Sequence, residues 1–341
     1  MENLPTQTKG VVTHKDRKVV YEFIPLTPIG DGDVLIRVHS APINPSDLAF
    51  RKGHYPAGKS KPAGVGFEGS GFVAAAGSSE EAQALLHQKV SFFASGHPET
   101  TGSWGEYVVL SANNTYRIPG DLDYEQGACC LTNPLTVQGF INICKTKGIT
   151  TIAHTPGASM MGKLLIAACK KSGIKLINFV RRAAQVEQLE SIGADVVINT
   201  GEENWAQTTK KVFGEHKPAA FFDAVAGPVS SQIITLLPDG AVTYNYGCLS
   251  LKPLSVGATD MIFKRKVVQG YWLNYDFNDP KVGKELFKAA FENFEEGVFK
   301  TPISARYPQE QFKEAIDFYK KNMSAGKVLL QNPNFNEDKF Q

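Results

Sequence analysis

Two spacings of apolar residues divide this chain. From residue 10 to about residue 119, apolar and polar residues alternate in short runs such as 19–24 (VVYEFI), separated by proline and glycine. A period of two, broken by turn residues, predicts antiparallel strands. The glycine-rich run 62–77 predicts strands that bend sharply or pack closely against another backbone.

Beyond residue 120 the spacing changes. Residues 123–145 place apolar side chains at helical intervals, and from about 150 to 248 short apolar runs alternate with helical segments. This alternation predicts right-handed βαβ units and a parallel sheet. The predicted strands of this region are 150–155, 175–180, 194–200, 219–227 and 240–247. Helices are predicted within 281–299 and 309–323, followed by a closing strand at 326–332.

Length and composition limit the classes of function. The chain has 341 residues, which favours two domains. A net charge of +2 gives no reason to expect nucleic acid or an anionic membrane as partner, and no apolar run reaches the roughly 18 to 20 residues needed for membrane insertion. Five cysteines without a C-x-x-C pair indicate a reducing compartment. We therefore expect a cytoplasmic protein, with a mitochondrial location as the alternative.

The stretch HTPGASMMGKLL, residues 154–165, fits two phosphate-binding loops. Gly157, Gly162 and Lys163 match most of a nucleoside triphosphate loop, but that loop needs Ser or Thr next, and Leu164 has no hydroxyl for a magnesium ion. The same glycines fit a dinucleotide fingerprint whose middle glycine is Ser159. Because the stretch follows a strand and opens a helix, we favour the dinucleotide loop, with Ser159 donating a hydrogen bond to the pyrophosphate and Lys163 pointing outward.

The end of the next predicted strand indicates which dinucleotide binds. An NAD site usually carries Asp or Glu about 20 residues after the loop. Here Val180 is followed by Arg181 and Arg182. Guanidinium groups pair with a 2′-phosphate, so we expect NADPH. The alternative is that both arginines are a solvated helix start.

The whole layout, a glycine-rich β region, a Rossmann half and a C-terminal return, resembles the medium-chain dehydrogenase/reductase superfamily. The resemblance implies an α/β fold with a GroES-like β-rich catalytic domain and a Rossmann doubly wound parallel sheet. It implies a catalytic domain over 1–121, an NADPH-binding domain over 122–266, and the remaining Rossmann strands with the return over 267–341. It also implies a homodimer joined through Rossmann edge strands.

Zinc enzymes of this superfamily use Cys, His and Cys on the catalytic metal. The matching positions are Asn44, Phe67 and Thr132, none of which is a good zinc ligand. Cys129 and Cys130 are adjacent without a histidine, which favours small buried helix residues. The resemblance therefore points to a zinc-free branch with no metal.

Two zinc-free branches of the superfamily are similar to this sequence. Residues 44–55 (NPSDLAFRKGHY) resemble quinone oxidoreductases, and the same run with NPLT, NFVRR and YWL resembles mitochondrial NADPH-dependent 2-enoyl thioester reductases. The resemblance to the second branch implies that Tyr55 donates a proton, and Asn44 is expected to orient the nicotinamide ribose. The implied NADPH contacts are Asn133, Thr136, Gly157, Ala158, Ser159, Met160, Met161, Gly162, Arg181, Arg182, Tyr246, Gly247, Cys248, Leu249, Tyr271, Trp272, Leu273 and Lys327.

The expected activity is reduction of an activated double bond in a small-molecule substrate. Hydride reaches the β-carbon, donors stabilise the enolate oxygen, and the α-carbon takes a proton. Tyr55 is the candidate donor, or else a loop tyrosine in a turn with Pro56. Asp47 is a candidate helix cap and Glu68 a structural acceptor. The alternatives are an NADPH:quinone oxidoreductase and a structural or accessory subunit that retains the fold.

Overall fold

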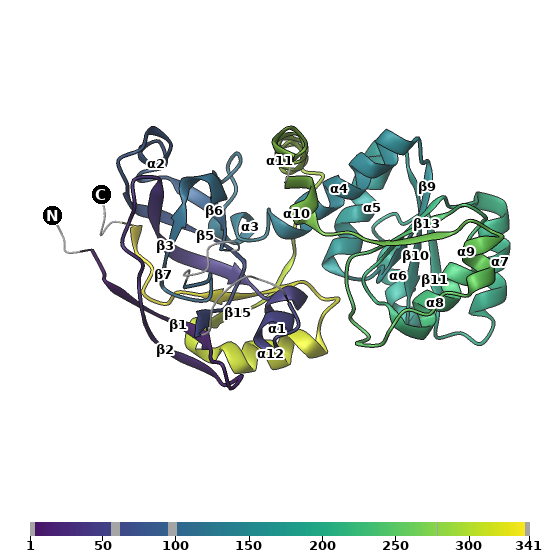
Figure 1. Cartoon of the computed structure of the whole chain (residues 1–341), viewed down its shortest axis with the longest axis horizontal. Coiled ribbons are helices and arrows are strands. Elements are labelled where there is room, and N and C mark those ends of the chain that lie inside the picture. Colours follow the sequence, from purple (N-terminus) through teal and green to yellow (C-terminus); the bar gives the residue numbers. More distant parts are fainter. Residues whose placement is uncertain (1–3, 56–61, 95–100, 278, 338–341) are drawn as a thin grey trace. The chain divides into compact units, whose positions relative to one another are not determined.

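The computed structural model describes residues 4–55, 62–94, 101–277 and 279–337 (Figure 1). The chain forms two compact units. The first, called the β unit, comprises residues up to 132 together with those from 300 onward, and the second, the α/β unit, comprises residues 133–299. The predicted boundary was residue 121, but the β unit continues beyond it. The Ser91 hydroxyl, in strand β6 (Lys89–Phe93), donates to the Gly127 carbonyl at 2.8 Å and so holds helix α3 (Tyr124–Gly127) against this strand.

The β unit contains two sheets. A three-stranded sheet has the order β2-β1-β4, and a seven-stranded sheet has the order β15-β16-β3-β5-β6-β8, with β7 also paired to β3. The strands are β1 (Gln7–Thr13), β2 (Val19–Pro25), β3 (Asp33–Pro42), β4 (Ala63–Gly64), β5 (Glu68–Ala76), β6 (Lys89–Phe93), β7 (Tyr107–Ser111), β8 (Thr115–Arg117), β15 (Ile303–Pro308) and β16 (Lys327–Gln331). The helices are α1 (Pro45–Arg51), α2 (Glu80–Gln83), α3 (Tyr124–Gly127) and α12 (Phe312–Lys321), with 3₁₀ turns at Ala112–Asn114 and Gln309–Gln311.

Glycine is required at positions where segments of the β unit approach one another closely. A Cβ added to Gly71 in β5 would lie 2.1 Å from the Arg37 carbonyl oxygen of β3. A Cβ on Gly66 would lie 2.2 Å from the Ser103 hydroxyl, and Gly66 also has a φ of +98°. The prediction of close backbone packing in the glycine-rich run is confirmed. Beneath it, Val34, Ile36 and Phe92 belong to a fully buried apolar core.

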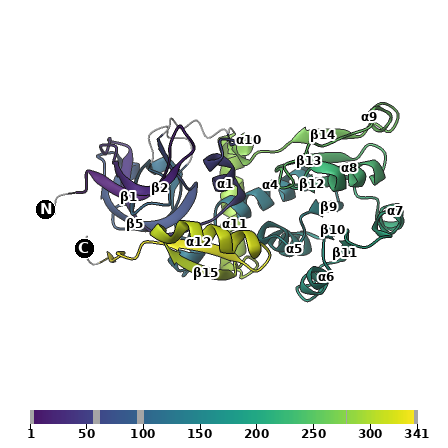
Figure 2. The ribbon, with the colours of Figure 1, turned by 90° about the horizontal axis from the view of Figure 1, so that it is seen from below.

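The α/β unit is built on one parallel sheet of six strands in the order β11-β10-β9-β12-β13-β14. Figure 2 shows these strands in order from β14 at the top to β11 at the bottom. The strands are β9 (Thr151–Thr155), β10 (Lys175–Val180), β11 (Val196–Asn199), β12 (Ala220–Asp223), β13 (Val242–Asn245) and β14 (Val267–Gly270). The helices are α4 (Thr132–Lys147), α5 (Met160–Ser172), α6 (Ala183–Glu190), α7 (Trp205–His216), α8 (Gly227–Leu236), α9 (Ala258–Ile262), α10 (Leu273–Phe277) and α11 (Pro280–Glu295).

This strand order is that of a doubly wound dinucleotide-binding sheet, so the predicted fold class is confirmed. The order reverses between β9 and β12, and ligands of such sheets bind where the strands end at the reversal. No helix within the described residues is both long and apolar enough to cross a membrane.

Candidate active site

Three side chains of the β unit, Asn44, Glu68 and Lys327, form one buried polar network, and residue 132 joins it through its backbone. The Asn44 amide nitrogen donates to Glu68 Oε1 at 2.7 Å. Lys327 Nζ donates to the Asn44 amide oxygen and lies 3.8 Å from Glu68 Oε1. The other Glu68 oxygen accepts from the Thr132 backbone N–H at 2.8 Å. The network thus joins four segments of the β unit: the start of α1, the start of β5, the start of β16 and residue 132.

A second carboxylate, that of Asp47, lies beside this network. Asp47 accepts from the backbone N–H groups of Asn44 at 2.7 Å and Phe67 at 3.1 Å. Asp47 was expected to cap a helix beginning at residue 46, but α1 begins at Pro45 and Asp47 is its third residue. It therefore makes the reciprocal bond of a capping box, back to the residue before the helix. Burial raises the pKa of Asp47 to about 7.

Tyr55 follows α1 and is half-buried. Its ring lies 5.1 Å from that of Phe67, centroid to centroid. The Phe67 backbone N–H donates to the Asp47 carboxylate, and the next residue along the chain is Glu68. The fold therefore brings Tyr55 to the segment that carries the network. The alternative role for Tyr55, a turn with Pro56, lies outside the described residues.

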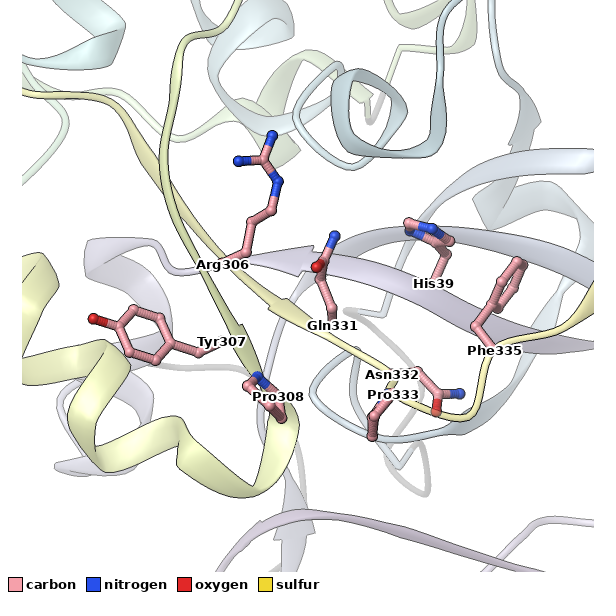
Figure 3. Close-up of a pocket in the computed structure, with 8 residues that line it drawn as sticks. All are labelled: His39, Arg306, Tyr307, Pro308, Gln331, Asn332, Pro333 and Phe335. Carbon is pink, nitrogen blue, oxygen red and sulfur yellow. The ribbon is translucent and has the colours of Figure 1, made fainter.

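A surface hollow of about 320 Å³ in the same unit is separate from this network (Figure 3). Arg306, which lines it, pairs with Glu125 at 2.5 Å. The hollow lies at the Gln331 end of β16, whereas Lys327 begins that strand. None of the predicted site residues lines it.

In the α/β unit, the loop between β9 and α5 has the geometry expected of a dinucleotide turn. A Cβ on Gly162 would lie 2.1 Å from the Gly157 carbonyl oxygen, and a Cβ on Gly157 would lie 2.9 Å from Cβ of Asn178. Both glycines are therefore required by close packing, as the fingerprint demands. Asn178 is fully buried, and its amide nitrogen and oxygen have no hydrogen-bond partner among the described residues.

Two expectations for this loop need correction. Ser159 is the N-cap of α5: its hydroxyl accepts from the Gly162 N–H at 3.0 Å and donates to the Pro156 carbonyl at 2.8 Å. Its proton is therefore engaged within the protein instead of being directed to a pyrophosphate. Lys163 does not point fully outward but is half-buried, and burial lowers the pKa of its ammonium group.

Arg181 and Arg182 follow β10 directly, and both are exposed. Arg182 is the N-cap residue of α6 and its side chain makes no capping bond. The Arg181 backbone N–H donates to Gln185 Oε1 at 3.1 Å. Neither guanidinium takes part in an ion pair with any residue that the structure describes.

Tyr246 and Tyr271 directly follow β13 and β14, and their hydroxyls make hydrogen bonds within the protein. Tyr246 shares a 2.7 Å hydrogen bond with His154 Nε2, and Tyr271 donates to Asp276 Oδ2 at 2.5 Å. Burial raises the pKa of both tyrosines and lowers that of His154 to about 3, so the imidazole is neutral. These phenols therefore buttress the strand ends, and the ring of Phe140 contacts both.

The remaining predicted contacts lie near the same strand ends or loops. A Cβ on Gly247 would lie 3.0 Å from that of Ala224, and the Leu249 N–H donates to the Ala224 carbonyl at 2.9 Å. Trp272 is half-buried against Tyr275. The other predicted contacts differ in how far they are buried. Cys248 and Leu249 are exposed, Asn133 and Thr136 are half-buried, and Ala158, Met160, Met161 and Leu273 are buried.

Sequence reasoning missed one residue that organises this edge. Asp223 ends β12, and its carboxylate accepts from Thr155 Oγ1 at 2.5 Å, Ser230 Oγ at 2.8 Å and the Asn245 amide at 3.0 Å. It also accepts from the N–H of Ala226, a non-glycine residue with a φ of +57°. The sequence feature that could have pointed to Asp223 is a single acidic residue at the end of an otherwise apolar strand.

Comparison with known proteins places this geometry in a family. Residues 30–120 match the alcohol dehydrogenase GroES-like domain, and residues 161–292 match the zinc-binding dehydrogenase family. The mitochondrial enoyl-[acyl-carrier-protein] reductase of Caenorhabditis elegans is 30% identical over 295 residues, covering 83% of this chain and 82% of that protein. The chain belongs to the medium-chain dehydrogenase/reductase superfamily. The superfamily predicted from the sequence is thereby confirmed.

Two further relatives support the assignment to this superfamily. The Arabidopsis thaliana enoyl-[acyl-carrier-protein] reductase, also mitochondrial, is 29% identical over 310 residues, or 86% of this chain and 79% of that protein. The crystal structure of a proposed NADPH:quinone reductase from Mesorhizobium loti superposes with a TM-score of 0.88 at 29% identity. It covers 96% of this chain and 99% of the other.

Zinc, which many members of the superfamily use, does not fit the donors present. The described residues contain no group of three or more His, Cys, Asp or Glu side chains that could hold a metal ion. At the matching positions, the Asn44 amide is bonded to Glu68 and Lys327, and Thr132 contributes its backbone N–H. The zinc independence of this protein stays a prediction.

Proposed function

We propose that this protein is a zinc-independent, NADPH-dependent reductase of activated carbon–carbon double bonds, acting on 2-enoyl thioesters or α,β-unsaturated carbonyl compounds. The observation that carries the proposal is the Asn44–Glu68–Lys327 network, a set of hydrogen-bonding groups where zinc members of the superfamily place metal ligands. Two relatives named enoyl-[acyl-carrier-protein] reductases, at 29% and 30% identity, support the substrate class.

The residues present fit the dinucleotide. The glycine turn admits no Cβ at positions 157 and 162, and α5 begins there with first-turn N–H groups at Met160 and Met161 that have no helical acceptor. The exposed guanidiniums of Arg181 and Arg182 would hold the 2′-phosphate. When bound, NADPH supplies a hydride.

The chain's own groups would then complete the reduction. Lys327 has N–H donors beyond the one that it gives to Asn44, and these suit a phosphate or a developing oxyanion. Tyr55 would give its hydroxyl proton to the α-carbon and regain a proton from solvent. Phe67 packs against the Tyr55 ring and would limit its orientation.

Quinone reduction is the second candidate. It is supported by the structural match to a proposed NADPH:quinone reductase at 29% identity. A quinone takes its proton on oxygen, so it needs no dedicated donor to carbon, and Tyr55 would then only line the pocket.

We also propose a homodimer joined along β14. This strand ends the six-stranded sheet, so its outer backbone groups are unpaired within the described sheet. Four exposed large apolar side chains lie on this strand or on α9 and the residue after it, which precede the strand along the chain: Met261, Ile262, Phe263 and Val267. For location, the names of the two enoyl reductase relatives favour the mitochondrial alternative.

The cofactor proposal is tested by titrating the purified chain with NADPH and NADH and following tryptophan fluorescence. We expect saturable NADPH binding that is at least tenfold tighter than NADH binding. Replacing Arg181 and Arg182 together by alanine should weaken NADPH at least tenfold and leave NADH within about twofold. Equal losses for both would contradict 2′-phosphate recognition, and no NADPH binding up to millimolar would favour a structural subunit.

A further inference from the structure

Glu68 contacts the side chains of both Asn44 and Lys327 and also bonds to the backbone of Thr132. Oε1 accepts from the Asn44 amide at 2.7 Å, and Lys327 Nζ lies 3.8 Å from the same oxygen. Oε2 accepts from the Thr132 N–H at 2.8 Å. Thr132 immediately precedes Asn133, itself a predicted cofactor contact.

These bonds leave the Asn44 amide a single orientation. Its nitrogen faces the carboxylate of Glu68 and its oxygen faces the ammonium of Lys327, so the opposite orientation would set like groups against each other. Lys327 is 4% exposed, and Glu68 is 1% exposed. A buried ammonium needs a nearby negative charge, and Glu68 is the nearest carboxylate to it among the described residues.

Asp47 is the other carboxylate near the ammonium, but it has a different function. Both of its oxygens are used by the backbone N–H groups of Asn44 and Phe67, which fix the start of α1. Cys129, which faces Glu68 and Lys327, is fully buried, and burial raises the pKa of its thiol. It therefore carries no charge that could balance Lys327.

We propose that Glu68 is a positioning residue of this site: it holds the Asn44 amide and the Lys327 ammonium in the arrangement in which both meet the dinucleotide. The inference rests on the proposed function, because it assumes that NADPH is the ligand. Glu68 itself does not touch the cofactor or the reacting atoms. It acts through the other two side chains, so the effect of its removal should be much smaller once Lys327 is absent and only its bond to Asn44 is left to lose.

The test is a double-mutant cycle read out as the dissociation constant for NADPH, measured by fluorescence on the full-length protein. The four proteins are the wild type, Glu68→Gln, Lys327→Met and the double variant. We expect Glu68→Gln alone to raise the dissociation constant at least tenfold. In the Lys327→Met background, Glu68→Gln should raise the dissociation constant for NADPH less than threefold, or lower it.

The matched control is Glu125→Gln. It makes the same chemical change in the same unit and breaks the ion pair with Arg306, a residue that lines the surface hollow and takes no part in the network's bonds. We expect its dissociation constant to stay within twofold of the wild type. If Glu68→Gln is not recovered as folded protein, Glu68→Asp replaces it in the cycle, because it keeps the charge but withdraws the carboxylate by one methylene.

The outcomes separate the two proposals. If Glu68→Gln weakens NADPH binding tenfold both in the wild type and in Lys327→Met, the positioning role is overturned and the proposed function stands. The same holds if it weakens NADPH binding tenfold in neither protein. Wild-type protein that does not bind NADPH contradicts the proposed function and this inference with it.

Discussion

At the scale of single residues, burial gives Asp47 and His154 properties that their residue type alone would not suggest. Asp47 is a fully buried carboxyl held by two backbone N–H groups, and burial raises its pKa to about 7. His154, in the other unit, is a buried imidazole kept neutral by the same effect. Neither property follows from the local sequence, because each depends on what the fold packs around the group.

The raised pKa of Asp47 predicts a pH dependence of stability. The folded protein holds this proton more tightly than the unfolded chain, so Asp47 stabilises the fold fully below about pH 4. That stability is lost as the pH rises to about 7, by about 4 kcal/mol at roughly 1.4 kcal/mol for each pKa unit. The excess stability of the wild type over Asp47→Asn should therefore shrink by several kcal/mol between pH 4.5 and 7.5, measured by urea unfolding.

Asp317→Asn is the control for that series, because Asp317 is an exposed carboxylate on α12. Its difference from the wild type should change by less than about 1 kcal/mol over the same range. A constant difference between wild type and Asp47→Asn would show that Asp47 does not take up a proton in the folded state near pH 7.

The second prediction at this scale concerns proton donation by Tyr55. Tyr55→Phe keeps the ring that packs against Phe67 and removes only the hydroxyl. We expect turnover of a crotonyl thioester to fall by about two to four orders of magnitude, the range for loss of a general acid. Reduction of a small quinone should stay within about threefold in the same preparation. Equal losses on both substrates would argue against proton donation to carbon.

At the scale of secondary-structure elements, the pattern of apolar residues predicted the parallel sheet because its central strands are buried on both faces. The runs 150–155 and 175–180 correspond to β9 and β10 almost residue for residue. The glycine turn was predictable for a similar reason, since the backbone packing at Gly157 and Gly162 excludes any side chain. Local pattern and fold agree in these segments.

Bonds between distant segments could not be predicted in this way. Lys327 and Asn44 are 283 residues apart, and Glu68 and Thr132 are 64 apart. No spacing rule pairs such positions, so Glu68 was expected only to accept a structural hydrogen bond. The resemblance to known reductases named Asn44 and Lys327, but the carboxylate that joins them became apparent only in the folded chain.

The cap of α5 gives a prediction for this element. Ser159→Ala removes the acceptor for the Gly162 N–H, and we expect a loss of about 1 kcal/mol of stability, as for other N-cap serines. NADPH affinity should change less than about threefold, because the hydroxyl proton is directed to the Pro156 carbonyl. Thermal unfolding and fluorescence titration measure the two quantities.

Ser79→Ala removes the equivalent N-cap of α2 in the β unit and serves as the control. It should cost a similar amount of stability and leave NADPH binding unchanged. A tenfold weaker affinity in Ser159→Ala without any loss of stability would show that this hydroxyl meets the cofactor after all.

At the scale of the whole molecule, the exposed apolar side chains around β14 predict self-association. Phe263 is 77% exposed and Ile262 65% exposed, beside the outer edge of the six-stranded sheet. We expect sedimentation of the wild type as a dimer and of Phe263→Asp largely as a monomer, since a charge at this position opposes burial. Phe23→Asp, on β2 and 60% exposed, should remain dimeric. Monomeric wild-type protein would contradict the proposed interface.

Isotopic labelling follows the hydride and the proton in the proposed reduction of a carbon–carbon double bond. The purified protein is supplied with NADPH carrying deuterium at the transferred position and with a crotonyl thioester, and the product is analysed by NMR. We predict a saturated thioester with deuterium on the β-carbon and a solvent-derived proton on the α-carbon. Labelled NADPH that is consumed with a quinone but yields no deuterated saturated thioester would contradict the account.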